Sequence, residues 1–526
     1  MNYIELFAGC GGLSLGLESI EGSYMVMANE LSPMPAETFV YNFFNEDLSQ
    51  EKLMPLRTKW LSSSFPVTDL PKRLREDPRS YPDLNSKQSY SDITNSDDLK
   101  GNLVVGNIIH LNEYLESNPE VVHKLRNSYG NGDLDFVSGG PPCQSFSMAG
   151  MRKKNCDKNS LPWEFANFVS KVKPKFAILE NVTGILRAFQ DGGENYYAWI
   201  EVSKAFSQIG YIPLCLHVNA KYVGIPQNRP RFIMIGVRED IFERLSATFN
   251  SAEKELFSSS LSFYQGTKYV TEGSDTQLKY HDVVCPNGLK LFQDSFLSEL
   301  VTHTESFISV SEAIDDLRFN GSNAKPSKHI KSNYLKLMRE TYKEPAMQYN
   351  HEERRNGEHV QRRFRLYQIM QLVGKGLAKE VKAVLKGASL DISHAVWEEF
   401  SQYDYLVDGG VYIKFNSKAE FLDFLINHQT KKQTQKALVA NNPAPAALSI
   451  PDDACHYHHD ELRTLTVREM ARIQSFPDSF VFRSKVTTGG QMRKFEVPQY
   501  TQVGNAVPPL LGRALGLSIK ELLSRL

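Results

Sequence analysis

The chain has 526 residues, which is more than one hydrophobic core usually holds, so we expect two lobes. Hydrophobic residues make up 41% of it and charged residues 23%, which is typical of a globular protein and excludes a disordered chain. The formal net charge is -1, so any contact with nucleic acid must come from local clusters of Lys and Arg.

The cysteines are scattered along the chain and include no CxxC pair, which speaks against a zinc site or a disulfide framework. They are Cys10, Cys143, Cys156, Cys215, Cys285 and Cys455. This usage fits a reducing compartment. Because the chain also shows no signal-peptide pattern and no apolar stretch of membrane-spanning length, we expect a cytoplasmic protein.

The N-terminal segment predicts a strand, a glycine-rich loop and a helix. The apolar run Tyr3–Phe7 leads into Ala8–Gly12, and leucines at helical spacing follow from Leu13. A second strand, Met25–Ala28, ends at Asn29 and Glu30.

Further short apolar runs are each separated by segments of helix length. They are Asp135–Val137, Phe176–Leu179 and Phe232–Val237. This alternation predicts a doubly wound α/β sheet whose ligands bind at the carboxyl ends of the strands.

Two stretches interrupt the alternation. Glu46–Asp98 is polar and weakly periodic, and we interpret it as a surface insertion. Glu239–Glu461 is long and irregular, which predicts that it forms most of a second domain.

The glycine-rich loop can bring backbone N–H groups close to a ligand, because glycines leave no side chain in the way. Glu30, at the end of the next strand, stands where a carboxylate can accept hydrogen bonds from ribose hydroxyls. A tight turn with a solvated Glu30 explains the pattern equally well.

A cysteine stands on a turn behind a predicted strand, in the sequence Ser138-Gly-Gly-Pro-Pro-Cys143-Gln-Ser-Phe-Ser147. The prolines make this turn rigid, and an ionised thiol is a strong nucleophile. A buried structural cysteine is the alternative.

Two further groups flank predicted strands, Glu180 after Phe176–Leu179 and the two arginines before Phe232–Val237. Glu180, in Glu180–Val182, could donate a proton to a ring nitrogen, although a structural ion pair is a common alternative. Arg229 and Arg231, two residues apart on an extended segment, are expected to share one face and to reach carbonyl, phosphate or carboxylate groups.

Taken in order, the motifs FAGCGG, NEL, GGPPCQSFS, ENV and QNRPR resemble those of the DNA cytosine-5 methyltransferases, in particular the bacterial restriction–modification type. Arg463–Pro477 and Gln502–Pro509 look like that family's late motifs. The resemblance implies a doubly wound S-adenosylmethionine-dependent methyltransferase fold with a smaller, irregular target-recognition domain. It implies three parts: a catalytic and cofactor-binding domain over 1–245 with its insertion at about 46–98, a target-recognition domain over 246–496, and a C-terminal segment, 497–526, that packs back onto the first.

The resemblance also implies a cofactor, S-adenosylmethionine, which leaves as S-adenosylhomocysteine. Phe7 would stack on its adenine, the loop would wrap its methionine end, and Glu30 would bind its ribose. The family usually has Gly-Asp-Ile where this chain has Gly106–Asn107–Ile108. The implied cofactor-binding set is Phe7, Ala8, Gly9, Gly11, Gly12, Leu13, Glu30, Leu31, Asn107, Ile108, Pro141, Asn505 and Ala506.

The implied reaction places a methyl group on carbon 5 of cytosine in a specific double-stranded DNA sequence. Cys143 would add to carbon 6, Glu180 would protonate or hydrogen-bond N3, and Arg231, helped by Arg229, would hold O2. The cytosine must be flipped out of the duplex.

Two basic segments are candidates for DNA contact. Arg152 and Lys153 follow the cysteine motif and suit a flap over phosphates, and Arg362 and Arg363 lie in the middle region. The alternative for the first segment is a solvated basic loop, and for the second a charged helix face without a function. We assign no metal to Cys455–Asp460, since adjacent residues rarely close one site.

The resemblance further implies a bacterial, nucleoid-associated enzyme that protects host DNA beside a restriction endonuclease. A tRNA cytosine-5 methyltransferase is disfavoured, because that family usually has PPCQPFTR and a Cys-Phe-Thr element that this chain lacks. A DNA-binding protein with a decayed site is disfavoured because Cys143, Glu180, Arg229 and Arg231 are all present.

Overall fold

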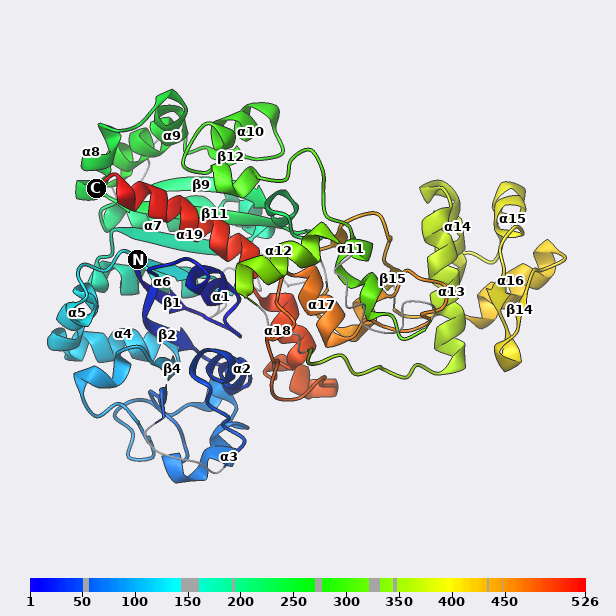
Figure 1. Cartoon of the computed structure of the whole chain (residues 1–526), viewed down its shortest axis with the longest axis horizontal. Helices are drawn as coiled ribbons and strands as arrows, with labels where there is room; N and C mark the ends of the chain where they lie inside the picture. The colour runs from blue at the N-terminus through cyan, green and yellow to red at the C-terminus, as the bar shows by residue number, and fades with distance from the viewer. Residues whose placement is uncertain are drawn as a thin grey trace. The chain divides into compact units, whose positions relative to one another are not determined.

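The computed structural model describes residues 1–50, 56–142, 160–191, 194–269, 277–320, 332–343, 348–432, 435–446 and 448–526. The chain forms two compact units (Figure 1). The sheet unit consists of Met1–Ile225, Arg229–Ser306 and Phe480–Leu526, and the helical unit of Pro226–Asn228 and Phe307–Ser479.

The boundaries of the units differ from those expected from the sequence. Residues 246–306 and 480–496, which we placed in the second domain, belong to the sheet unit. Helix α9 (Ser251–Thr267) packs on strand β9 (Tyr211–Asn219). The segment after Phe480 is bound to helix α2 (Pro33–Phe44), because the backbone N–H of Val481 donates to Asn42 Oδ1 at 2.8 Å.

Among the described residues, nine strands form one sheet in the order β12-β9-β11-β6-β5-β1-β2-β4-β3. Strand β11 is antiparallel to β6 and β9, and the other neighbours are parallel. The chain runs from β1 to β2 on one side and returns to β5 on the other, so β1 and β5 flank a switch point, where such sheets bind ligands. The remaining bounds are β1 Asn2–Leu6, β2 Tyr24–Glu30, β3 Thr58–Trp60, β4 Leu103–Val105, β5 Phe136–Gly139, β6 Phe176–Val182, β11 Pro230–Arg238 and β12 Tyr280–Asp282.

Helices cover both faces of this sheet, which confirms the doubly wound α/β architecture. On one face, Ile4, Leu6 and Leu179 share an apolar core with Phe165 and Phe168. The helices in that layer are α4 (Ile108–Ser117), α5 (Pro119–Arg126), α6 (Leu161–Val172) and α7 (Ala198–Gln208). None of the helices in the described part of the chain could cross a membrane.

On the other face, helix α1 (Gly12–Glu18) packs along the C-terminal helix α19 (Pro509–Ser524), as Figure 1 shows. Glycines allow the two helices to approach closely. A Cβ atom on Gly16 would lie 2.1 Å from the Pro509 carbonyl oxygen, and one on Gly512 would lie 2.9 Å from that of Leu13. The last helix of the chain is therefore part of the layer that supports the glycine-rich loop.

The segment that we interpreted as a surface insertion is in part built into the sheet. Strand β3 pairs in parallel with β4, and Trp60 is fully buried. Arg73 is also buried, and its guanidinium contacts Asp92 at 2.6 Å. A strand of three residues has too little periodicity to be recognised from sequence, because its stability comes from its pairing partner.

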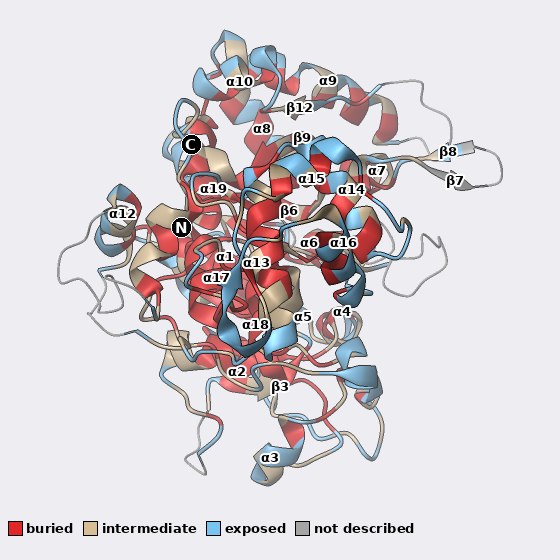
Figure 2. Ribbon diagram, turned by 90° about the vertical axis from the view of Figure 1, so that its right-hand side faces the viewer, coloured by how far each residue is buried: buried red, intermediate tan, exposed pale blue. Residues whose placement is uncertain are grey.

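The helical unit has its own apolar core, to which Phe364, Leu366 and Ile369 of α13 contribute together with Phe421 and Leu425 of α16. All residues of α17 are buried (Figure 2). The helices are α11 (Val310–Ile314), α12 (Asn333–Tyr342), α13 (Glu358–Leu372), α14 (Lys375–Leu385), α15 (His394–Phe400), α16 (Lys418–Asn427) and α17 (Val467–Ile473). Short strands pair as β10 (Gln227–Asn228) with β16 (Ala444–Pro445), β13 (Tyr405–Leu406) with β14 (Tyr412–Ile413), and β15 (Lys436–Ala437) with β17 (Ala454–Cys455).

Candidate active site

The candidate catalytic and cofactor-binding residues that the structure describes all lie in the sheet unit. Most of them lie at or just beyond the carboxyl ends of β1, β2, β4, β5 and β6. The others lie at the start of β11 and at the end of α18 (Gln499–Asn505). Cys143, Arg152 and Lys153 lie outside the described residues.

Glu180 and Arg231 form an ion pair on neighbouring antiparallel strands. Arg231 Nε lies 2.7 Å from Glu180 Oε1, and the two side chains are 9% and 14% exposed. In the register of β11 and β6, Arg231 stands opposite Val182, two residues from Glu180 and on the same face. Burial lowers the pKa of Arg231 from its usual value, and the Glu180 carboxylate opposes that change.

The turn that leads to Cys143 lies against Glu180. A Cβ atom on Gly140 would stand 2.9 Å from Glu180 Oε2, so only glycine fits there without displacing the carboxylate. Asn181 Nδ2 donates to the Pro141 carbonyl oxygen at 3.1 Å. From the sequence, Asn181 is recognisable only as part of a motif, whereas in the structure its amide ties this turn to β6.

Arg229 does not join that ion pair. Its Nη2 donates to the carbonyl oxygens of Gly504 at 2.7 Å and Ala506 at 3.1 Å, and the residue is buried. Burial lowers the pKa of Arg229, and the neighbouring Arg231 charge lowers it further. The sequence predicted that both arginines act together, whereas the structure gives Arg229 a separate contact with the end of α18.

The glycine-rich loop is held by Glu30. Its two carboxylate oxygens accept from the backbone N–H groups of Gly9 and Ser32, each at 2.8 Å. Phe7, Gly9 and Gly11 have positive φ values of 55°, 56° and 93°. Glycine adopts such values readily, whereas a positive φ is uncommon for a phenylalanine. Burial raises the pKa of Glu30, and its backbone hydrogen bonds oppose that rise.

A second buried carboxyl, Glu5, lies beneath the loop and was not predicted to matter. Ser14 Oγ of α1 donates to Glu5 Oε2. Burial raises the pKa of Glu5 to about 8, with the Glu30 charge adding to the rise. An acidic residue inside the apolar run Tyr3–Phe7 was the signal that could have identified it.

The other implied cofactor residues differ in exposure. Ala8, Gly12, Leu13, Ile108 and Pro141 are buried, whereas the side chain of Leu31 is 38% exposed and Asn505 is exposed. Asn107 is the N-cap of α4, where its Oδ1 accepts from the Ile109 N–H at 3.0 Å. This oxygen has one further lone pair for a ligand.

The arginines of the middle region are engaged within the helical unit. Arg362 Nη2 contacts Glu358 at 3.1 Å and also pairs with Asp408, and Arg363 is buried. The structure therefore does not present either one as an exposed cation for DNA phosphates.

His458, His459 and Asp460 place potential ligand atoms within 4.8 Å of one another. However, His458 Nε2 lies 2.7 Å from Arg318 Nη1, and its Nδ1 accepts from the Asp460 N–H at 3.3 Å. A guanidinium in contact with a ring nitrogen competes with a metal for it, so this cluster is a poor cation site.

The fold is a doubly wound α/β sheet, and the largely buried Glu180–Arg231 pair lies on β6 and β11, on the β5 side of its switch point. The family model for the C-5 cytosine-specific DNA methylases matches residues 1–70 and 112–521. The chain belongs to this family, and by class it is a DNA cytosine-5 methyltransferase.

Several relatives match this chain, some of them over nearly its whole length. The type II methyltransferase M.DdeI of Desulfomicrobium norvegicum is 25% identical over 98% of this chain and 87% of its own length. M.Bpa9945I of Bacillus paralicheniformis is 26% identical over 100% of this chain and 99% of its own. M.HindV of Haemophilus influenzae is 33% identical over 45% of this chain and 53% of its own.

Proposed function

We propose that this protein transfers a methyl group from S-adenosylmethionine to carbon 5 of a cytosine flipped out of a specific double-stranded DNA sequence, through a covalent bond between Cys143 and carbon 6. The observation that carries the proposal is the Glu180–Arg231 pair, which lies against the Gly140–Pro141 turn that leads to Cys143. The proposed acid and the proposed cation thus lie together against the turn that precedes the proposed nucleophile in the chain.

The residues at the switch point suit S-adenosylmethionine. A Cβ atom on Gly9 would meet no described atom within 4 Å, so the backbone there has room for a ligand. The Glu30 carboxylate accepts hydrogen bonds from two backbone N–H groups and has lone pairs left to accept from ribose hydroxyls. Leu31 and Asn505, also in the proposed cofactor set, are exposed. When bound, this cofactor supplies an electrophilic methyl group.

The protein's own residues prepare carbon 5 to receive it. Addition of the Cys143 thiolate to carbon 6 breaks the aromaticity of the ring and makes carbon 5 nucleophilic. Glu180 hydrogen-bonds or protonates N3 as charge develops there, and Arg231 holds O2 while it fixes the Glu180 carboxylate. After methylation, loss of the carbon 5 proton and elimination of Cys143 restore the aromatic ring.

We assign Arg229 a supporting role rather than a contact with the base. Its hydrogen bonds to Gly504 and Ala506 fix the carbonyl groups on either side of Asn505, which lies in the proposed cofactor set. The Arg229 side chain thus connects the start of β11, the strand that carries Arg231, to the proposed cofactor site.

The biological role that we propose is protection of host DNA beside a restriction endonuclease, with the enzyme acting on the cytoplasmic nucleoid. The support is that the relatives M.DdeI and M.Bpa9945I, which span nearly the whole chain, are type II methyltransferases. We propose that the helical unit reads the target sequence.

The test is to incubate the protein with methyl-labelled S-adenosylmethionine and DNA, to digest the DNA to nucleosides and to identify the labelled product. We expect 5-methyl-2′-deoxycytidine from the unaltered protein and none from Cys143→Ala. Label on the exocyclic amino group would contradict the proposed target atom. Label in tRNA but not in DNA would replace the proposed substrate.

A further inference from the structure

The family match is interrupted between residues 70 and 112, yet this part of the chain contributes strand β4 to the sheet. Strand β3 extends the sheet beyond β4, which pairs in turn with β2. At the carboxyl end of β3, the N–H of Leu61 donates to the Val105 carbonyl at 2.9 Å. A Cβ atom on Gly106 would stand 2.8 Å from Leu61 Cβ, so the two segments are in close contact.

Tyr81 reaches from this segment to the residue after Glu30. Its hydroxyl donates to the Leu31 carbonyl oxygen at 3.2 Å, and the residue is 7% exposed. Burial raises the pKa of Tyr81 well above its usual value, so the hydroxyl keeps its proton and remains a donor at neutral pH.

The same short stretch of backbone is also held from the sheet. The Glu30 carbonyl accepts from the Gly106 N–H at 3.0 Å, and the Glu30 carboxylate accepts from the Ser32 N–H. Tyr81 supplies the corresponding bond for the next carbonyl along the chain. Two parts of the region between the matched ranges therefore hold the Glu30–Ser32 turn, one at Gly106 and one at Tyr81.

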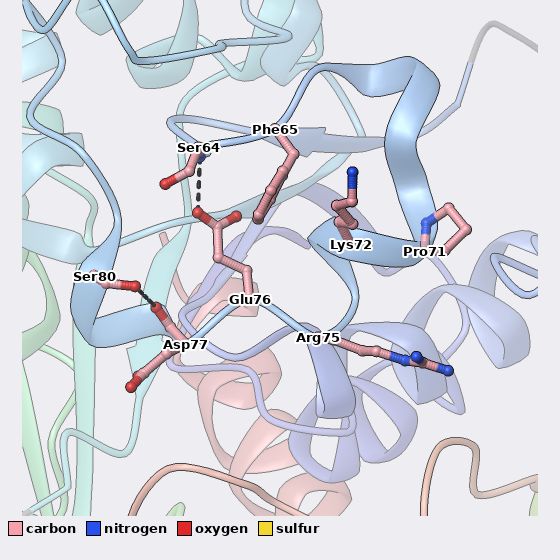
Figure 3. Close-up of a pocket in the computed structure, with 8 residues that line it drawn as sticks. All are labelled: Ser64, Phe65, Pro71, Lys72, Arg75, Glu76, Asp77 and Ser80. Atoms are coloured by element: carbon pink, nitrogen blue, oxygen red, sulfur yellow. Dashed lines mark hydrogen bonds between the residues drawn. The ribbon is translucent and has the colours of Figure 1, made fainter.

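Internal hydrogen bonds order the segment that carries Tyr81. Glu76 accepts from Ser63 Oγ at 2.6 Å and from the Ser64 N–H at 2.7 Å, the second of which Figure 3 shows. Ser80 Oγ donates to the Asp77 carbonyl at 2.8 Å, also shown in Figure 3. Ser64, Glu76, Asp77 and Ser80 line a pocket of about 430 Å³ in this segment.

We propose that Tyr81 is a positioning residue for the cofactor, whose hydroxyl holds the Leu31 carbonyl and thereby fixes the turn that receives the adenosine half of S-adenosylmethionine. The inference rests on the proposed function, because it takes Glu30 and Leu31 as the adenosine site. It assigns a role in cofactor binding to a segment that the family model does not cover.

The test is Tyr81→Phe, which removes one hydroxyl and keeps the ring. We expect the dissociation constants of S-adenosylmethionine and of adenosine alone to rise by the same factor, about fivefold, as loss of one hydrogen bond predicts. The KM for S-adenosylmethionine should rise equally, while kcat at saturation should stay unchanged. Calorimetric titration and initial rates measure these quantities.

Tyr129→Phe is the matched control, because the Tyr129 hydroxyl donates to the Ser96 carbonyl at 2.6 Å, elsewhere in the same unit. It should leave both dissociation constants unchanged. Unaltered adenosine binding by Tyr81→Phe, or an equal loss of affinity in Tyr129→Phe, would overturn the inference alone. Absence of S-adenosylmethionine binding by the unaltered protein would overturn the proposed function together with it.

Discussion

Arg231 and Glu180 lie on adjacent antiparallel strands with 2.7 Å between Nε and Oε1, at the point where the turn toward Cys143 passes the carboxylate. This pair places the proposed proton donor and the proposed O2 ligand on one face of the sheet. Because the ion pair restrains both side chains, we expect them to be in place before a base enters the proposed site.

Replacing Glu180 with Gln should abolish most of the activity without unfolding the protein. The amide can still accept from Arg231 but cannot give a proton to N3, so we expect kcat to fall by about 100-fold or more. Single-turnover methyl transfer measures this loss, and cofactor titration should show an unchanged affinity. A variant with near-normal kcat would remove Glu180 from the mechanism.

Replacing Arg229 with Lys should affect the cofactor side more than the base side. An ammonium at this position cannot reproduce both bonds to the Gly504 and Ala506 carbonyls, and we expect the free energy of unfolding to fall by about 1–3 kcal/mol. Affinity for S-adenosylmethionine should weaken as the end of α18 loosens. If kcat fell while cofactor affinity and stability stayed normal, Arg229 would instead act on the cytosine.

The close packing of α1 and α19 predicts that Gly16→Ala destabilises the protein. The added Cβ would meet the Pro509 oxygen at 2.1 Å and the Arg513 nitrogen at 2.5 Å, and backbone atoms cannot move aside as a side chain can. The overpacking cost of about 1–3 kcal/mol or more should exceed the gain of about 1 kcal/mol in helix propensity. Urea unfolding measures the difference.

Gly376→Ala is the control for that experiment. Gly376 lies in α14, and a Cβ there would meet no described atom within 4 Å. The substitution should leave stability unchanged or raise it slightly. Equal effects of the two substitutions would argue against the packing described for Gly16.

Glu5 predicts that the protein becomes less stable as the pH rises through neutrality. Its pKa is about 8 when folded and near 4.5 when unfolded, so between these values the folded state holds more protons. The free energy of unfolding therefore falls as pH increases across this window. In Glu5→Gln this part of the pH dependence should be missing, so denaturation curves at pH 6, 7 and 8 should converge. Parallel profiles in the two proteins would show that Glu5 titrates normally.

Much of the fold followed from local patterns. Each predicted apolar run corresponds to a strand of the sheet, and the observed ends differ from the predicted ones by at most three residues. The runs end at Phe7, Ala28, Val137, Leu179 and Val237. A buried parallel strand is a continuous apolar run between turn signals, so its position can be predicted from a few residues.

The features that sequence analysis missed depend on contacts between distant segments. Arg229 meets carbonyl groups of Gly504 and Ala506, about 275 positions away, and Tyr81 meets Leu31, 50 positions away. A spacing of two residues on a strand places Arg229 and Arg231 on one face but does not say what each will contact. The compact units differ from the expected domains for the same reason, since α9 belongs to the sheet unit through its packing on β9.

The most direct test of the central claim is covalent trapping on DNA that contains 5-fluorocytosine. The fluorine blocks the final elimination, so an enzyme that adds Cys143 to carbon 6 should remain attached to the DNA in the presence of S-adenosylmethionine. We expect a denaturation-resistant adduct from the unaltered protein and none from Cys143→Ala, and the trapped DNA would reveal the recognition sequence. A protein that binds the cofactor and the DNA but forms no adduct would contradict the covalent mechanism.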